Sequence, residues 1–208
     1  MSEYYIPTAP SETEFTEKRS RFIGHVSPVE DEAGARACIE PMKKRYHDAR
    51  HNCWCYRLHA GGVERYSDDG EPQGTAGQPM LNVFQREGIT NVVCVSTRYF
   101  GGILLGAGGL TRAYTRSAKD ALDAAGRSVV RPWTEVECRC PYPLFERFRL
   151  ELAALEGVEG EHVFDAEITF RGLLPQGRED RFAQKLGELS AGDVVPRVTG
   201  TRHKAVPV

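Results

Sequence analysis

The chain has 208 residues, of which 40% are hydrophobic and 27% are charged. These values are typical of a globular protein with a hydrophobic core and exclude a disordered chain. The formal net charge is -2, so any attraction for nucleic acid must come from a local basic patch. No apolar run reaches the roughly 18 residues of a membrane helix, and the N-terminus lacks the features of a signal peptide. We therefore expect a cytoplasmic protein with no membrane partner and with reduced cysteines.

Strands and helices alternate in the first part of the chain. The hydrophobic pattern predicts strands over residues 15–29, 49–58 and 91–96. It predicts helices over 31–46, with Asp31 as the N-cap, over 78–86, and over 110–125, where Gly126 ends the helix. Between 61 and 74 the glycine and proline content indicates a loop or a hairpin.

After Pro132 the pattern changes. It predicts strands over 134–140, 158–164, 166–173 and 194–199, and helices over 143–155 and 178–189. This β-α-β-β-α-β order is that of a ferredoxin-like domain. We therefore expect an α+β protein with two domains, residues 1–131 and residues 132–208.

The segment from Arg98 to Lys119 carries the strongest chemical signal. A buried strand ends there, five glycines follow within nine residues, and a helix with a basic stripe begins. Glycine lets a backbone approach a ligand closely, and a helix N-terminus attracts phosphate. No Asp or Glu interrupts this segment. It predicts a phosphate or nucleic-acid site made by Arg98, Gly101, Gly102, Gly106, Gly108, Gly109, Arg112, Arg116 and Lys119. The alternative interpretation is that the glycines allow close packing of helix on sheet and that the basic stripe is a solvated face.

Two further groups of residues suggest an enzymatic alternative. Asp68, Asp69 and Glu71 place three carboxylates in four positions, which would hold Mg²⁺ if their geometry converged. An exposed acidic turn explains the same residues without a metal. His51 would be a general base, or the partner of a nucleophilic Cys53, although a buried thiol is the simpler interpretation of that cysteine.

The six cysteines include two C-x-C pairs, Cys53 with Cys55 and Cys138 with Cys140. Zinc sites usually separate paired cysteines by two to four residues, whereas alternation on a strand would bury both thiols of a C-x-C pair on one face. We therefore interpret these cysteines as buried hydrophobic residues and predict no metal and no cofactor.

Several stretches resemble the YigZ/IMPACT family, and the resemblance covers essentially the whole chain. They are KRSRFIG (18–24), DARHNCW (48–54), DDGEPQGTAGQP (68–79), TRYFGG (97–102) and LGAGGLTRAY (105–114). The resemblance implies that the first domain has the fold of the second domain of ribosomal protein S-five, a sheet with helices on one face. It implies that the second domain is similar to the last domain of elongation factor G. Family members often carry Lys where this chain has Leu105 and Thr where it has Ala107.

The resemblance also suggests a function. Eukaryotic relatives act in the control of translation during amino-acid starvation, and both implied folds occur in proteins that handle ribosomes or nucleic acids. We therefore predict a non-enzymatic RNA- or ribosome-binding protein that modulates translation or its stress response, with RNA or a ribosome-associated factor as its partner. The alternative is an enzyme acting on a phosphorylated small molecule or a nucleotide, with or without Mg²⁺.

Overall fold

The computed structural model describes residues 3–208, which form two compact units, each with its own hydrophobic core. The N-terminal unit comprises Tyr4–Val129 and Ala205–Val208, and the C-terminal unit comprises Val130–Lys204. The division falls inside two long strands, β7 (Arg127–Cys140) and β11 (Arg197–Pro207). The last four residues therefore group with the N-terminal unit, whereas the sequence assigns them to the second domain.

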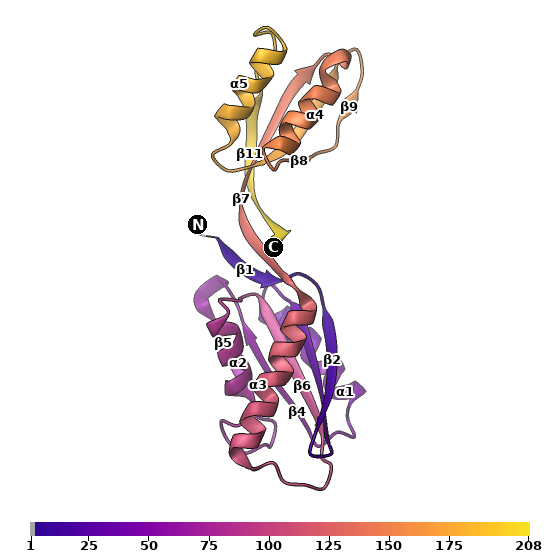
Figure 1. The fold of residues 1–208 in the computed structure, drawn as a ribbon, viewed down its shortest axis with the longest axis vertical. Coiled ribbons are helices and arrows are strands. Elements are labelled where there is room, and N and C mark those ends of the chain that lie inside the picture. Colours follow the sequence, from indigo (N-terminus) through magenta and orange to yellow (C-terminus); the bar gives the residue numbers. More distant parts are fainter. Residues whose placement is uncertain (1–2) are drawn as a thin grey trace. The chain divides into compact units, whose positions relative to one another are not determined.

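An antiparallel five-stranded sheet in the order β2-β3-β6-β4-β5 forms the centre of the N-terminal unit (Figure 1). Every residue of the middle strand except the last is buried, which explains its apolar first half, residues 92–95. The short strand β1 (Tyr4–Pro7) joins this unit through a bridge to Ile89. The five strands are β2 (Ser11–Glu17), β3 (Ser20–Pro28), β6 (Val92–Tyr99), β4 (His51–Arg57) and β5 (Glu64–Ser67).

The single strand predicted over 15–29 is in fact a hairpin. β2 pairs with β3 from Ser11 opposite Val26 to Glu17 opposite Ser20. The two residues that connect these strands, Lys18 and Arg19, have φ values of 43° and 67°. Left-handed backbone is unusual for such side chains, so the sequence contained no ordinary turn signal here.

Helices cover both faces of this sheet. On one face α2 (Gly77–Arg86) and α3 (Gly106–Ala125) pack on apolar side chains such as Phe22 and Cys94. On the other face α1 (Glu32–Arg45) packs on Val93 and Val95. Figure 1 shows α2 and α3 in front of the sheet and α1 behind it. The expectation of helices on one face therefore holds for α2 and α3 and not for α1.

The C-terminal unit has the order β-α-β-β-β-α-β, because the single strand predicted over 158–164 is in fact two strands of two residues each. Its sheet runs β11-β7-β10-β8, with β9 also paired to β10. The helices pack on this sheet through a core that contains Phe148, Phe170 and Phe182. The elements between β7 and β11 are α4 (Phe145–Ala154), β8 (Val158–Glu159), β9 (Val163–Phe164), β10 (Ile168–Pro175) and α5 (Glu179–Leu189). Short 3₁₀ turns lie at Tyr142–Leu144 in this unit and at Ala60–Gly62 in the N-terminal unit. The α+β fold class is confirmed.

No helix in the described part of the chain is long and apolar enough to span a bilayer.

The position of α3 depends on its close approach to β3. A Cβ added at Gly24 would lie 2.6 Å from the backbone oxygen of Ser117. In the same region the hydroxyls of Ser96 and Ser117 lie 2.8 Å apart and form a buried hydrogen bond. The small residues at this crossing therefore set how closely the helix lies on the sheet.

Gly24→Ala tests this contact. The added methyl group must push α3 away from β3, and we expect a loss of about 1–3 kcal/mol in the free energy of unfolding. Gly108→Ala, in the first turn of the same helix, is the control because its Cβ would meet only the end of the Arg112 side chain, at 3.5 Å. Urea unfolding followed by circular dichroism measures both. Equal stability of Gly24→Ala and the wild type would contradict the packing.

Candidate nucleic-acid interface

The candidate site surrounds the N-terminus of α3. This helix begins at Gly106, which has a φ of 70°, a conformation that glycine adopts without strain. The residue before it, Leu105, supplies no side-chain cap. In the described structure no side chain accepts a hydrogen bond from the first-turn N–H groups, so they remain available to an anion.

The glycine loop before α3 packs against the β2–β3 hairpin. A Cβ at Gly101 would lie 2.0 Å from the backbone oxygen of Arg19, so any larger residue would separate loop and hairpin. Gly102 has a φ of 83°. Gly101 therefore allows close packing, but of the loop on the hairpin and not of a helix on the sheet. Gly106 and Gly108 are exposed in the first turn of the helix, and Gly109 there is half-buried.

Two cavities flank the start of α3, and Leu105 lines both of them. The first, which we call the His51 cavity, has a volume of about 360 Å³, and its wall includes Arg50, His51, Glu71, Arg98, Phe100 and Gly106. The second, which we call the Arg112 cavity, has a volume of about 230 Å³ and is lined by three basic side chains, Lys18, Arg112 and Arg116, and one acidic side chain, Glu17. His51, the acidic turn and the glycine loop therefore converge on one cavity.

Arg98 does not have the role that the sequence suggested. Its Nη1 donates a hydrogen bond to Oε1 of Glu71 at 2.7 Å, and the two side chains are only 6% and 3% exposed. The Tyr114 hydroxyl donates to the same Oε1 at 2.8 Å. Because Glu71 neutralises its charge, Arg98 belongs to a buried structural network and is removed from the predicted phosphate site.

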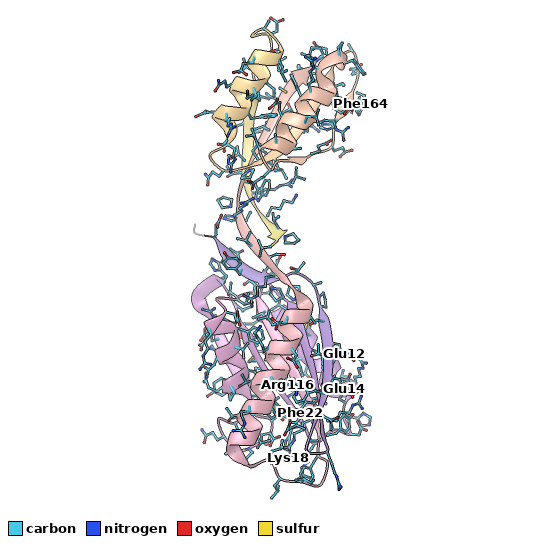
Figure 2. The ribbon with its side chains drawn as sticks, viewed as in Figure 1. Glu12, Glu14, Lys18, Phe22, Arg116 and Phe164 are labelled. Atoms are coloured by element: carbon cyan, nitrogen blue, oxygen red, sulfur yellow. The ribbon has the colours of Figure 1, made fainter. Side chains whose placement is uncertain are left out.

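Most of the basic stripe on α3 is also paired. Arg116, labelled in Figure 2, contacts Asp120 at 3.2 Å and lies over the ring of Phe15. Lys119 pairs with Asp123 and, at 3.7 Å, with Glu87. These carboxylates lie outside the acid-free segment, so the sequence pattern overstated the free positive charge. Among residues 3–208, Arg112 is the one member of the stripe without an ion pair.

The three carboxylates of the acidic turn do not form a magnesium site. Asp68 accepts hydrogen bonds from the backbone N–H groups of Gly74, Ala76 and Gly77 and so stabilises the start of α2. Asp69 accepts one from the N–H of Asn52 at 2.7 Å, and Glu71 binds Arg98. The described residues contain no cluster of three metal-ligating side chains. The prediction that these residues hold Mg²⁺ is therefore wrong.

His51 lines its cavity with a defined tautomer. Its Nδ1 lies 2.8 Å from the backbone oxygen of Asp69, and because a carbonyl can only accept, Nδ1 carries the hydrogen. The neutral ring therefore has an unprotonated Nε2, which lies 3.8 Å from Oε2 of Glu71. The register of the sheet explains the arrangement, because His51 on β4 lies directly opposite Arg98 on β6.

Five of the six cysteines are buried thiols, and Cys38 is half-buried. Burial raises the pKa of Cys138 to about 12 and that of Cys140 to about 11. Burial also raises the pKa of Cys53 strongly, and this thiol donates a hydrogen bond to the backbone oxygen of Asp68. A buried thiol with a raised pKa carries little thiolate at neutral pH and is a poor nucleophile, which argues against Cys53 as the nucleophilic partner of His51.

Three basic residues outside the predicted set belong to this end of the unit. Lys18 and Arg19 form the β2–β3 turn, and Arg50 lies at the mouth of the His51 cavity. All three are exposed, and within the part of the chain that the structure describes none makes an ion pair. Figure 2 shows Lys18 at the end of the unit where α3 begins. Together with Arg112 they form what we call the cation cluster: Lys18, Arg19, Arg50 and Arg112.

Comparison with known proteins places the site within a recognised domain. The Impact N-terminal domain matches residues 18–122 and a domain of unknown function (DUF1949) matches 138–193. The IMPACT family member YigZ of Escherichia coli is 33% identical over 197 residues, covering 93% of this chain and 97% of that protein. The chain belongs to the IMPACT family. The first of the two matched domains contains the whole cation cluster and both cavities, apart from the lining residues Phe15 and Glu17.

Other relatives show how far the similarity extends. The IMPACT family member YvyE of Bacillus subtilis is 32% identical over 193 residues, covering 92% of this chain and 89% of that protein. Protein IMPACT of Oryctolagus cuniculus is 30% identical over 105 residues, which cover 49% of this chain and 33% of that protein. A solved structure described as a hypothetical protein has a TM-score of 0.61 and 31% identity, covering 100% of this chain and 98% of that one.

The structural role of Arg98 in this IMPACT family member can be tested directly. Arg98→Met leaves the buried Glu71 carboxylate without its counter-charge, and we expect a loss of about 3–5 kcal/mol in the free energy of unfolding. Arg98→Met combined with Glu71→Gln removes both charges and should recover more than half of that loss. Urea unfolding measures both variants. A loss below about 1 kcal/mol for Arg98→Met, the range of an exposed ion pair, would contradict the assignment.

Proposed function

We propose that this IMPACT family member is a non-enzymatic RNA-binding protein that modulates translation, with RNA, free or on the ribosome, as its partner. The observation that carries the proposal is the cation cluster at the uncapped N-terminus of α3. Backbone N–H groups and the helix dipole favour phosphate there. Lys18, Arg19, Arg50 and Arg112 supply charges that no carboxylate of the described chain neutralises.

The charge distribution supports this location over the open face of the C-terminal sheet. On the open face of the C-terminal sheet, Glu137 binds both Arg171 and Arg197, and Glu135 binds Arg202. Paired charges of this kind offer little net attraction for phosphate. The free positive charge around α3 is therefore the better candidate for binding a polyanion in a protein whose net charge is -2.

The enzymatic alternative loses its main support. It required Asp68, Asp69 and Glu71 to hold Mg²⁺, and each of these carboxylates instead binds groups of the protein itself. What remains of that alternative is the Nε2 of His51 in a cavity beside the phosphate-attracting helix. A cavity of this kind also suits recognition without chemistry, so we do not propose a reaction.

RNA binding through the cation cluster predicts a specific salt dependence. Lys18→Glu with Arg112→Glu should weaken binding of a single-stranded RNA at least tenfold at low salt. The slope of log K against log salt should fall by about 0.7 for each phosphate that the variant no longer neutralises. Filter binding at several salt concentrations measures both quantities.

The matched control is Arg36→Glu with Arg86→Glu, which changes the charge of the same unit by the same amount. Arg36 lies on α1. Arg86 is the last residue of α2, and the next residue, Glu87, pairs with Arg127, which follows α3. We expect the control to retain most of the affinity and the slope. The proposal fails if the wild type binds no RNA at low salt, or if the two double variants behave alike.

Restoring a cation should strengthen the site. Leu105 lines both cavities, and a lysine there can lie along the apolar wall and place its ammonium group at the mouth. We expect Leu105→Lys to bind RNA a few-fold more tightly and with a steeper salt slope. Leu105→Met is the control for altered packing and should leave the affinity unchanged. Unchanged or weaker RNA binding by a folded Leu105→Lys protein would contradict the position of the site.

A further inference from the structure

We propose that the His51 cavity binds the base of one unpaired guanine nucleotide in the bound RNA. The inference rests on the proposed function and adds to it a preference for one kind of base. It follows from three properties of the cavity: unfilled acceptors on its inner wall, apolar sides, and a positive mouth.

The inner wall presents two hydrogen-bond acceptors without donors. Glu71 lines the cavity with a side chain that is only 3% exposed. Its Oε1 already accepts from Arg98 and Tyr114, whereas its Oε2 has no hydrogen bond. The Nε2 of His51, which is the acceptor of the ring in its neutral form, lies 3.8 Å from that Oε2. A carboxylate oxygen and an imidazole nitrogen with a free lone pair both accept hydrogen bonds, so the wall is suited to a ligand with two neighbouring N–H or O–H donors.

The same wall excludes phosphate from the depth of the cavity. The Arg98 charge is already neutralised by Glu71, and the free oxygen of that carboxylate would repel an anion. The sides are apolar, with Pro72, Phe100 and Leu110 among the lining residues. Phe100 is 46% exposed, which leaves part of its ring open for stacking, as in many sites for single-stranded RNA. A volume of about 360 Å³ lies in the usual range for small-ligand sites.

The mouth of the cavity has the opposite polarity. Gly106 and Ala107 of the first turn of α3 line it, and Arg50 lies at its edge. The free N–H groups of that turn and the guanidinium attract an anion. The cavity therefore matches a ligand that has hydrogen-bond donors at its inner end, a flat apolar body and a phosphate at its outer end. A nucleotide whose base is inserted into the cavity has these three parts in this sequence.

The donor pattern selects among the bases. Guanine carries the N1–H and N2–H₂ donors side by side, which suit the neighbouring acceptors of Glu71 and His51. Adenine and cytosine each offer an amino group beside an acceptor. Uracil presents its single N–H between two carbonyl oxygens, which would face the two acceptors. The expected order is therefore guanine first and uracil last.

Fluorescence anisotropy with two labelled hexanucleotides tests the inference, one of six uridines and one with a single guanosine in the middle. We expect the guanosine-containing strand to bind about tenfold more tightly, the discrimination of one well-formed pair of hydrogen bonds. Ala107→Trp should fill the mouth and reduce this ratio to near one, and His51→Leu should reduce it by removing one acceptor. Ala124→Trp, the same change at an exposed position near the other end of α3, should leave it intact.

The outcomes separate this inference from the proposed function. Equal binding of both strands by the wild type, or a ratio unchanged in Ala107→Trp, overturns the inference and leaves RNA binding standing. If neither strand binds, the proposed function fails, and the cavity is then tested alone with GMP and UMP in a thermal-shift assay. A higher melting temperature with GMP than with UMP supports the cavity inference, and no shift with either overturns it as well.

Discussion

The buried ion pair between Arg98 and Glu71 is the interaction on which the site depends. It joins β6 to the acidic turn, and through Tyr114 and Ser20 it also reaches α3 and β3. A lone buried charge is costly, so these elements must come together for either charge to be accommodated. The pair therefore fixes the turn beside His51 and the start of α3 beside the turn. It also leaves one oxygen of Glu71 facing the cavity without a hydrogen-bond donor.

The basic residues around α3 divide into two groups. Arg98, Arg116 and Lys119 pair with carboxylates, and of these pairs only the one made by Arg98 is buried. The cation cluster is exposed and unpaired in the described structure, and it gathers where the helix dipole of α3 adds positive potential. A protein with a slightly negative total charge can in this way present a local anion site. The glycines divide similarly, since Gly101 permits close packing and Gly106 begins the helix.

Local patterns predicted the elements better than the site. The two helices of the C-terminal unit and the end of α3 at Gly126 followed from apolar periodicity and helix-ending signals, which depend on neighbouring residues. The β2–β3 hairpin was missed because Lys18 and Arg19 adopt left-handed backbone without glycine or asparagine. The partner of Arg98 lies 27 residues away in sequence, so no local pattern indicated that its charge is neutralised. Free charge was therefore overestimated on α3 and overlooked in the hairpin turn.

The central claim is that RNA binds at the start of α3. Nuclear magnetic resonance titration of the labelled protein with a short single-stranded RNA tests it most directly, because each backbone amide reports its own position. We expect the amide signals of Gly106, Gly108 and Gly109 to move most, together with those of Lys18 and Arg19. Shifts confined to the open face of the C-terminal sheet, around Arg171, with the first turn of α3 unchanged, would contradict the claim.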